Sequence, residues 1–123
     1  MLKGIGIDAT EIERFRVWHT YSSSRLRKIF SQDEITYCLS TPKKSAERFA
    51  VRFATKEAFL KALVSAGRRI SLLRVCKAVS ITINDESPSM SVDWKLLDVN
   101  AMNVHFSLSH TKSSAVAVVV LAE

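Results

Sequence analysis

The residues best suited to chemistry lie on one predicted helix, which covers about residues 43–66. At about 100° per residue, Glu57 and Lys61 fall within the apolar side of that helix, whereas an ordinary surface pair would face away from it. The apolar side consists of Phe49, Phe53, Leu60, Leu63 and Val64. One interpretation places Glu57 and Lys61 in a cleft. The other is a helix-stabilising pair, which contributes about 0.2–0.5 kcal/mol when exposed.

A second carboxylate, Asp8, follows a short apolar segment with two glycines. Residues 2–7 predict a strand in which both glycines share a face with Asp8 and leave space in front of its carboxylate. Asp8-Ala-Thr-Glu11 also has the spacing of a capping box, and a helix over about residues 10–17 would explain Asp8 without a ligand. Two carboxylates at the edges of apolar elements also suit Mg²⁺, when substrate phosphates supply further oxygen ligands. Both explanations remain open on spacing alone.

The segment His105-Phe-Ser-Leu-Ser-His110-Thr-Lys predicts a strand with one polar face. A serine nucleophile is disfavoured because the chain has no GxSxG turn, and because Ser109 and His110 would point to opposite strand faces. Phosphate or nucleotide contact by His110, Thr111 and Lys112 fits these residue types better. Solvent-exposed turn residues are the alternative.

The elements that must position these residues follow the order strand, helices, then several strands. A capped helix is expected from Ser31 through Cys38, and the long helix should end at Gly67. Alternating apolar residues then predict a hairpin, with strands at 79–83 and 90–94 joined by a turn at 84–88. A helical patch at 96–102 and strands at 104–108 and 115–121 complete the pattern, the last as a buried strand. This order predicts an α+β fold.

The length and composition indicate one ordinary globular domain that covers residues 1–123. Eighteen Lys and Arg residues against twelve Asp and Glu residues give a net charge of +6, so an anionic partner is expected. Nucleic acid, phospholipid, a phosphorylated cofactor and an acidic protein all meet that description. Cys38 and Cys76 fit neither a metal motif nor a disulfide framework, which favours a reduced, cytoplasmic setting. No segment has the length of apolar sequence that would span a membrane.

Three segments point together to one family. They are Gly4-Ile-Gly-Ile-Asp8 with Arg14 downstream, the helix segment from Arg52 through Glu57 to Lys61, and the strand segment from His105 to Lys112. In order and spacing they resemble the signatures of the bacterial holo-acyl-carrier-protein synthases, the small 4′-phosphopantetheinyl transferases. The resemblance implies a long central helix packed on an antiparallel sheet. It also implies transfer of 4′-phosphopantetheine from coenzyme A to a serine of apo acyl carrier protein, with release of adenosine 3′,5′-bisphosphate.

The resemblance further implies roles for the acidic and basic residues of the first two segments. Asp8 and Glu57 would hold Mg²⁺ together with the coenzyme A diphosphate, and Lys61 would neutralise the phosphate under attack. Either Glu57 or a metal-bound water would accept the proton of the incoming serine. The water is favoured because a carboxylate bound to Mg²⁺ is a poorer base.

The coenzyme contacts implied by the resemblance lie elsewhere in the chain. Arg52, Lys43 and Lys44 would meet the nucleotide phosphates, and His110 with Thr111 would sit at the end of a strand from a neighbouring subunit. Family members of this length are homotrimers with each active site at a subunit interface. Such sharing suits a chain this short, which can hardly enclose a coenzyme alone.

Acyl carrier proteins are acidic, so the resemblance also assigns the excess positive charge to a partner. Arg14, and the basic segment that contains Arg25, would dock the carrier. A nucleic-acid-binding module is the alternative for the same charge, although no helix-turn-helix, zinc-finger or RNP signature is present. Residues 64–69 and 84–89 depart from the family's loop patterns, so the contacts to adenine and pantetheine cannot be carried over.

Overall fold

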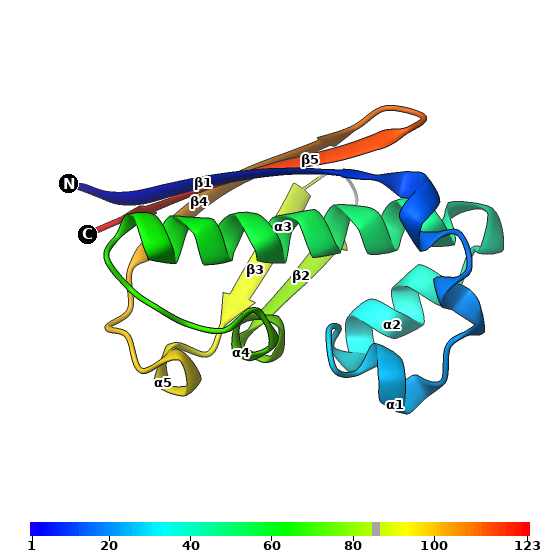
Figure 1. Ribbon diagram of the computed structural model, residues 1–123, viewed down its shortest axis with the longest axis horizontal. Helices are drawn as coiled ribbons and strands as arrows, with labels where there is room; N and C mark the ends of the chain where they lie inside the picture. The colour runs from blue at the N-terminus through cyan, green and yellow to red at the C-terminus, as the bar shows by residue number, and fades with distance from the viewer. Residues whose placement is uncertain (85–86) are drawn as a thin grey trace.

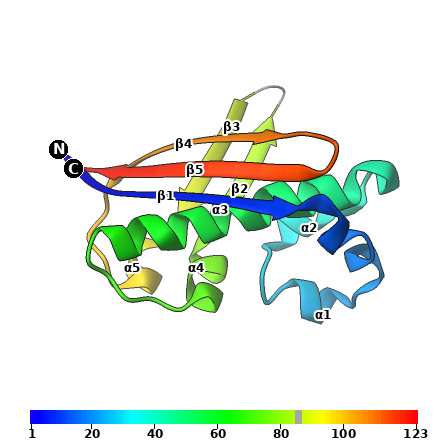
Figure 2. The same cartoon turned by 45° about the horizontal axis from the view of Figure 1, so that its top comes forward.

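A three-stranded antiparallel sheet lies along one long helix at the centre of the computed structural model, which describes residues 1–84 and 87–123 (Figure 1). The strands are β1 (Leu2–Glu11), β5 (Ser114–Ala122) and β4 (Asn103–His110), in the spatial order β1-β5-β4 (Figure 2). Helix α3 (Ser45–Ser65) covers one face of this sheet. The predicted α+β fold, with a long helix on an antiparallel sheet, is therefore confirmed.

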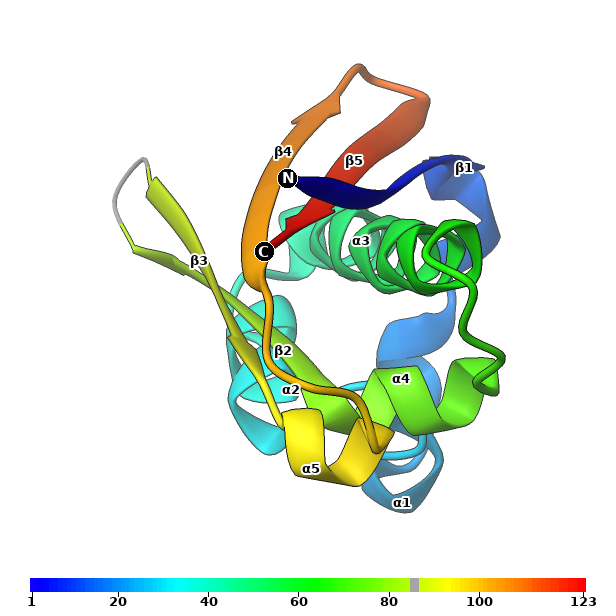
Figure 3. The same ribbon diagram turned by 90° about the vertical axis from the view of Figure 1, so that its left-hand side faces the viewer.

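The smaller helices lie on the side of α3 that faces away from the sheet, and a two-stranded hairpin flanks these layers near β4 (Figure 3). The sheet on one side and these smaller elements on the other enclose α3 (Figure 3). In chain order these elements are η1 (Ile12–Phe15), η2 (Trp18–Thr20), α1 (Ser23–Leu26), α2 (Gln32–Leu39), η3 (Pro42–Lys44), α4 (Leu72–Ala78), β2 (Val79–Asn84), β3 (Ser87–Val92) and α5 (Trp94–Leu97).

Two glycines let β1 and α3 approach backbone to backbone. A Cβ atom at Gly4 would overlap the carbonyl oxygen of Ala62, and one at Gly6 would overlap the carbonyl oxygen of Ala58. Small alanines on the facing side of the helix complete this close contact. The glycines therefore make room for α3 itself, rather than for open space in front of Asp8 as the sequence predicted.

Strand β1 continues to Glu11, and the helix predicted over residues 10–17 is wrong. Asp8 pairs with Ala117 and Glu11 with Ser114, so the whole segment belongs to the ladder with β5. Only two short 3₁₀ turns follow, and the residue that precedes the first of them is Glu11, whose side chain makes no capping bond. The capping explanation of Asp8 is therefore excluded. Pairing with a valine-rich strand outweighs the local helical pattern.

Helix α3 is buried on two sides because it lies between the sheet and the smaller helices. Phe59, on one side, packs in a cluster with residues of β5, α4 and β2, while Phe49 and Phe53 pack with residues of α1 and α2. Val64 is exposed, so the predicted apolar side is wrong at that position. A helix enclosed in this way has no single apolar side to detect.

The capped helix, the end of α3 and the hairpin follow the predictions closely. Ser31 and Glu34 form a complete capping box at the start of α2. After α3, Gly67 adopts a left-handed φ of 87°, and its amide donates to the carbonyl of Val64. In the hairpin Ile81 pairs with Met90. The predicted turn at 84–88 includes residues 85 and 86, which lie outside the described residues.

Two predicted bounds need correction near the end of the hairpin. Trp94 begins helix α5 instead of ending β3, because Asp93 caps the helix by accepting a hydrogen bond from the amide of Leu96. Helix α5 then ends early, since Asp98 adopts a left-handed φ of 56°. Strands β4 and β5 are each slightly longer than predicted.

The sheet has one covered face and one open face. In β5, alanines and Val119 face α3, whereas Val116, Val118 and Val120 point to the other side and are only partly covered. The prediction of a fully buried strand is therefore wrong for half of its residues. In register with these valines, Ile5 and Ile7 of β1 are 53% and 61% exposed. In the described part of the chain, no helix is long and apolar enough to cross a membrane.

Candidate active site

Lys61 joins the long helix to the first strand. Its Nζ donates to Oδ1 of Asp8 at 3.0 Å and to the carbonyl oxygen of Ile7 at 3.1 Å. The Asp8 side chain is 15% exposed and that of Lys61 is 51% exposed, so the pair lies at an open edge between β1 and α3. The structure thus brings two of the predicted site residues into direct contact.

Glu57 lies one helical turn before Lys61 and is partly buried. Burial raises the pKa of its carboxyl, and the nearby negative charge of Asp8 raises it further, while Lys61 and Arg14 act in the opposite direction. Four of the predicted residues therefore share one electrostatic environment. Two neighbouring carboxylates are suited to a shared cation, which removes the repulsion between their charges.

The chemistry of these donors fits Mg²⁺ only in part. Both side chains supply the carboxylate oxygens that Mg²⁺ prefers, but Mg²⁺ takes six ligands in octahedral geometry. Among the described residues there is no group of three or more His, Cys, Asp or Glu side chains suited to a metal ion. The remaining ligands of a cation held here would be water or oxygen atoms of a bound substrate.

Arg14 is exposed on η1, beside an aromatic cluster. Its guanidinium carbon lies 5.0 Å from the ring centre of Phe53 and 5.7 Å from that of Phe15. These rings hold a positive charge at the edge of the cluster formed by Asp8 and Glu57. The predicted helix around Arg14 is absent, so aromatic packing rather than helix geometry positions this side chain.

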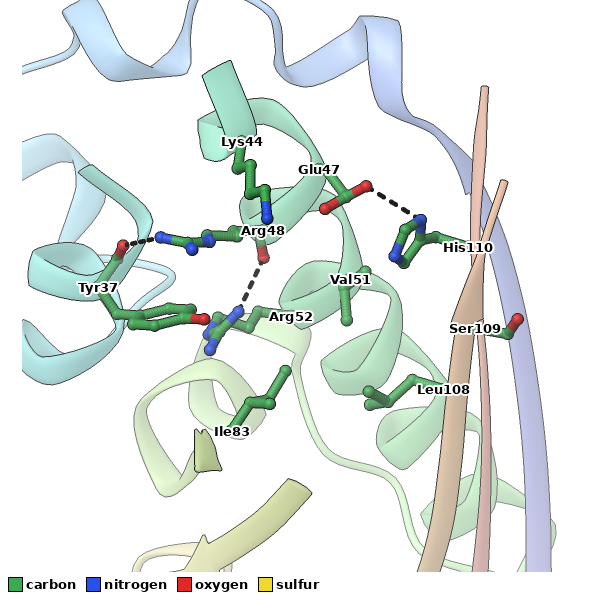
Figure 4. Close-up of a pocket in the computed structure, with 10 residues that line it drawn as sticks. All are labelled: Tyr37, Lys44, Glu47, Arg48, Val51, Arg52, Ile83, Leu108, Ser109 and His110. Carbon is green, nitrogen blue, oxygen red and sulfur yellow. Dashed lines mark hydrogen bonds and ion pairs between the residues drawn. The ribbon is translucent and has the colours of Figure 1, made fainter. Parts of the chain in front are cut away.

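A cavity of about 250 Å³ opens between α2, the first half of α3, β2 and the end of β4 (Figure 4). Three of the predicted coenzyme contacts, Lys44, Arg52 and His110, line it. The remaining lining residues are Tyr37, Glu47, Arg48, Val51, Ile83, Leu108 and Ser109. Cationic side chains thus dominate the charged groups of this cavity.

Arg52 is the most deeply placed of these cations, with only 1% of its surface exposed. Its Nη1 donates to the carbonyl oxygen of Arg48 at 3.3 Å, and its Nε is buried with no hydrogen-bond partner in the structure described. A buried guanidinium normally pairs with an anion, because removing a charge from water is costly. A bound anionic ligand would provide that partner.

The other predicted coenzyme contacts differ in their surroundings. His110 Nδ1 lies 3.0 Å from Oε1 of Glu47, which is an ion pair when the histidine is protonated. Lys43 is exposed and does not line the cavity. Thr111 is used in the turn between β4 and β5, where its hydroxyl oxygen accepts hydrogen bonds from the amides of Ser113 and Ser114.

Arg25 lies on α1, outside both groups of residues. It is exposed, and its guanidinium carbon lies 3.8 Å from the ring centre of Tyr21. The neighbouring Arg27 and Lys28 are exposed as well. The predicted basic segment is therefore a charged surface formed by α1 and the residues that follow it, although α1 has only four residues.

The carboxylate cluster and the cationic cavity occupy different sides of α3. Arg52 and Glu57 are five residues apart, and at about 100° per residue their directions differ by about 140° around the helix axis. The cavity lining includes none of Asp8, Glu57 and Lys61. One ligand that contacts both groups within a single chain would have to pass around the helix.

A buried ion pair, which was not predicted from the sequence, determines how α3 is rotated about its own axis. Lys56 Nζ lies 2.7 Å from Oε1 of Glu34 and also donates to the carbonyl oxygens of Ile29 and Cys76. The second Glu34 oxygen accepts from the amide of Ile81. These bonds tie α3 to α2, α4 and β2, and so direct the next residue, Glu57, toward β1. Glu34 was predicted only as a capping residue, and no local spacing relates it to Lys56.

Tyr37, Glu47 and Arg48 were also missed as candidates. The spacing of four residues between Arg48 and Arg52 could have shown that both guanidinium groups lie on one side of the helix. No sequence signal identifies Tyr37, because its position beside them depends on how α2 packs on α3.

Comparison with known proteins gives a consistent result across the chain. The family model described as the 4′-phosphopantetheinyl transferase superfamily matches residues 4–119. Holo-[acyl-carrier-protein] synthase of Chlamydia muridarum is 39% identical over 119 residues, covering 95% of this chain and 92% of its own. The protein of the same name from Chloroherpeton thalassium is 38% identical over 120 residues, covering 95% of each chain.

Two solved structures agree with these relatives. The holo-(acyl-carrier-protein) synthase of Bacillus anthracis, in complex with CoA (3′,5′-ADP), has a TM-score of 0.77 at 29% identity and covers 98% of this chain and 96% of its own. That of Helicobacter pylori, in complex with coenzyme A, has a TM-score of 0.72 at 30% identity and covers 96% and 99%.

Proposed function

The chain belongs to the 4′-phosphopantetheinyl transferase superfamily, and on that premise we propose that it is a holo-acyl-carrier-protein synthase. It transfers 4′-phosphopantetheine from coenzyme A to a serine of an apo acyl carrier protein. The observation that carries this proposal is the cluster of Asp8, Glu57 and Lys61 beside an open edge of the sheet. Family membership takes the place of the nucleic-acid alternative as an explanation of the +6 charge.

Asp8 and Glu57 are the residues that would hold Mg²⁺, together with the diphosphate of coenzyme A. Bound there, Mg²⁺ would stabilise the negative charge that develops on the departing phosphate oxygen. Lys61 already orients the Asp8 carboxylate through its 3.0 Å contact. Its ammonium group also faces the open edge, where it neutralises the phosphate under attack.

The reaction forms one bond and breaks another at the same phosphorus atom. The serine oxygen attacks the phosphate that carries pantetheine, and the bond from that phosphorus to the bridging oxygen breaks. Adenosine 3′,5′-bisphosphate leaves with the bridging oxygen. The serine proton passes to water held at the site, because a carboxylate engaged with a cation is a weak base.

The cationic cavity would receive the nucleotide part of coenzyme A. Arg52 supports this assignment because its buried guanidinium lacks an anionic partner among the described residues. Lys44 and His110 line the same cavity and supply further donors. Lys43 and Thr111 lie next to those two residues, and we keep them as outer contacts of the same nucleotide.

We further propose that the active form is a homotrimer whose sites lie between subunits. The open sheet face supports this, because Ile5 and Ile7 lie in register with a row of valines and form an apolar stripe that needs cover. The separation of the cavity from the carboxylate cluster supports it as well. A neighbouring chain that covers the stripe would bring its own cavity, at the His110 end of β4, toward Asp8.

The partner protein is an acidic apo acyl carrier protein. Arg14 and Arg25 are both exposed, and each is steadied by an aromatic ring, so their charges are presented without a large loss of side-chain freedom. We also propose a cytoplasmic location, because Cys38 and Cys76 are both free thiols and free thiols are typical of reducing compartments.

The proposal is tested by incubating the protein with coenzyme A, Mg²⁺ and several bacterial apo acyl carrier proteins. Mass spectrometry of the intact carrier should show the addition of one phosphopantetheine group, and liquid chromatography should show adenosine 3′,5′-bisphosphate in equal amount. A carrier whose acceptor serine is replaced by alanine is the control. If no carrier gains mass, the proposed activity is wrong.

A further inference from the structure

Lys56 and Glu34 form an ion pair in the interior of the protein, where their side chains are 0% and 1% exposed. The Lys56 ammonium group can donate three hydrogen bonds, and it donates all three. Its acceptors are Oε1 of Glu34 at 2.7 Å, the carbonyl oxygen of Ile29 at 2.7 Å and that of Cys76 at 3.1 Å. These acceptors come from separate segments of the chain, so Lys56 is held from several directions.

The Glu34 carboxylate is also bonded through both of its oxygen atoms. Oε1 accepts a further bond from the amide of Ser31 at 2.8 Å, and Oε2 accepts one from the amide of Ile81 at 3.0 Å. Ser31 is the cap of α2, and Ile81 lies in β2. Because every ammonium donor and both carboxylate oxygens have partners, the network specifies one arrangement of α3 against α2, α4 and β2.

Stability alone does not explain why charged groups occupy this position. Moving two charges out of water is costly, and uncharged side chains of similar volume in place of a buried ion pair often leave stability unchanged or raise it. The surroundings are partly apolar, since the ring centre of Phe30 lies 5.3 Å from Lys56 Nζ. Removal of one partner alone is strongly destabilising, because the other charge then stays buried without a partner.

The position of Lys56 in α3 connects the ion pair to both parts of the proposed site. Lys56 directly precedes Glu57, and it lies four residues after Arg52, which lines the cationic cavity. At about 100° per residue, Glu57 and Arg52 point in different directions from the helix axis. One rotational setting of α3 therefore directs both side chains at once.

The position of Glu34 connects the ion pair to the opposite wall of that cavity. Tyr37, three residues later on α2, lines the cavity, and its ring packs against two arginines of α3 (Figure 4). The ring centre lies 4.0 Å from the guanidinium carbon of Arg48 and 4.8 Å from that of Arg52. The bond from Glu34 to α3 thus fixes this wall in relation to the helix.

Small rotations of α3 matter for catalysis because its functional side chains extend away from the helix axis. An atom about 5 Å from the axis moves by about 1 Å when the helix turns by about 10°. A displacement of about 1 Å in a catalytic group can lower a rate about 100-fold. An ion pair that fixes this rotation can therefore control the rate without touching the substrate.

We infer that Lys56 and Glu34 are positioning residues for phosphopantetheine transfer, which hold the Glu57 carboxylate in a fixed orientation relative to the cationic cavity. This inference rests on the proposed function and adds to it two residues that contact neither substrate. The pair acts through Glu57, so its loss lowers turnover and leaves carrier docking unchanged. The alternative is that the glycine contacts of β1 hold α3 alone, in which case the pair has no effect on turnover.

The first experiment compares Lys56→Met with the double variant Glu34→Gln/Lys56→Met, each at a temperature at which circular dichroism shows it to be folded. The single variant should melt at a lower temperature, because the Glu34 carboxylate stays buried without its partner, and the double variant should regain much of that loss. The kcat of the double variant should nevertheless stay about tenfold or more below that of the wild type. Its KM for the carrier should remain within about twofold.

Leu97→Ala is the matched control, because it opens a cavity in the core beside α5 without altering a charge. It should lower the melting temperature and leave kcat within about twofold of the wild type. If the kcat of the double variant recovers together with its melting temperature, the ion pair is only structural and the inference is overturned. A double variant that does not fold overturns it as well, because the pair is then required for stability.

The second experiment tests whether the ion pair acts through Glu57. Glu57→Gln is combined with the double variant, and single-turnover rates are measured for the wild type, Glu57→Gln, the double variant and the combination. In the Glu57→Gln background, loss of the pair should lower the rate by at most about twofold, because the group that it positions is already absent. Independent effects would multiply, so a further tenfold loss in that background overturns the positioning role.

A crystal structure of the double variant, which needs neither coenzyme A nor carrier, measures the positioning directly. The Glu57 carboxylate should be displaced by about 1 Å relative to Asp8. If the wild type transfers phosphopantetheine but the carboxylate is not displaced, the glycine contacts hold α3 alone and only the positioning role is wrong. If the wild type transfers nothing to any carrier, the proposed function fails, and this structure still decides whether the ion pair holds α3.

Discussion

At the scale of single residues, the contact between Lys61 and Asp8 positions both charged groups. The lysine orients the carboxylate, and the carboxylate keeps the ammonium group at the edge of the sheet. Glu57, whose pKa is raised by burial and by the charge of Asp8, completes a group in which every member changes the electrostatics of the others. Substitutions within it should therefore affect catalysis more than folding.

Replacing Asp8 by Asn tests this separation, because the amide keeps the shape of the side chain and removes the anionic oxygen. We expect turnover to fall about 100-fold or more, with little change in melting temperature, since Asp8 caps no helix. Glu57→Gln should behave in the same way, and Lys61→Met should lower turnover through lost charge stabilisation. Asp33→Asn on α2 serves as the control. Near-normal turnover of Asp8→Asn at limiting Mg²⁺ would contradict the metal assignment.

The two thiols provide a second prediction at this scale. Burial raises the pKa of Cys38 to about 12 and that of Cys76 to about 11, against about 9 in the unfolded chain. The neutral thiols therefore support the fold fully below pH 9, and this support is lost as the pH rises toward 11 and 12. At neutral pH an alkylating reagent should modify neither thiol until the protein unfolds. Rapid labelling of the native protein, followed by mass spectrometry, would contradict this.

The residue types predicted from the sequence were largely the ones that the structure groups, but their partners were not. A pair between Glu57 and Lys61 along one helix was one of the two interpretations that the sequence left open, and the structure instead joins Lys61 to Asp8, 53 residues away in the chain. Helical spacing describes neighbours within an element only. Contacts between β1 and α3, and the stack of Arg48 and Arg52 on Tyr37, depend on packing that no local pattern contains.

At the scale of elements, the close contact of β1 with α3 places the site. Gly4 and Gly6 allow the strand to lie against the helix backbone, which puts Asp8 within reach of a lysine on that helix. The sequence predicted the strand, the long helix and the hairpin, because each has a clear period and clear end signals. The strand after Ile7 was mistaken for a helix, since its pairing partner, β5, lies more than a hundred residues later.

Gly6→Ala should destabilise the protein by about 3 kcal/mol or more, because the added methyl group would overlap the backbone of α3. Urea denaturation followed by circular dichroism measures the change. Gly67→Ala is the comparison, since that residue has a positive φ but open space around its Cβ position, and it should cost about 1 kcal/mol. A loss for Gly6→Ala no larger than that for Gly67→Ala would contradict the close packing.

At the scale of the whole molecule, the effect of the +6 net charge on a partner depends on where the basic side chains lie. Arg14→Glu should raise the KM for the acidic carrier about tenfold and leave the KM for coenzyme A nearly unchanged. Added salt should weaken carrier binding in the wild type in the same direction. Steady-state kinetics with each substrate varied in turn will measure both effects. Equal losses for the two substrates would place Arg14 outside the docking surface.

The proposed trimer makes the most demanding prediction about the whole molecule, because it requires one active site to use residues of two chains. Sedimentation equilibrium should give three times the 13.8 kDa chain mass at micromolar concentration, and Ile7→Glu should shift the protein to monomers by charging the open sheet face. A wild-type monomer would contradict the shared site.

Mixed trimers then test which residues are shared. Asp8→Asn and Arg52→Met chains should each be nearly inactive alone, since one lacks the carboxylate and the other the buried cation of the cavity. In a mixed trimer, an intact Asp8 from one chain can meet an intact Arg52 from its neighbour, so co-expressed chains should recover activity well above the sum of the two variants. The control is a mixture of the two variant trimers assembled separately, between which no subunits have exchanged. If co-expression recovers nothing although mixed trimers are isolated by their two affinity tags, the carboxylate cluster and the cationic cavity serve the same site within one chain.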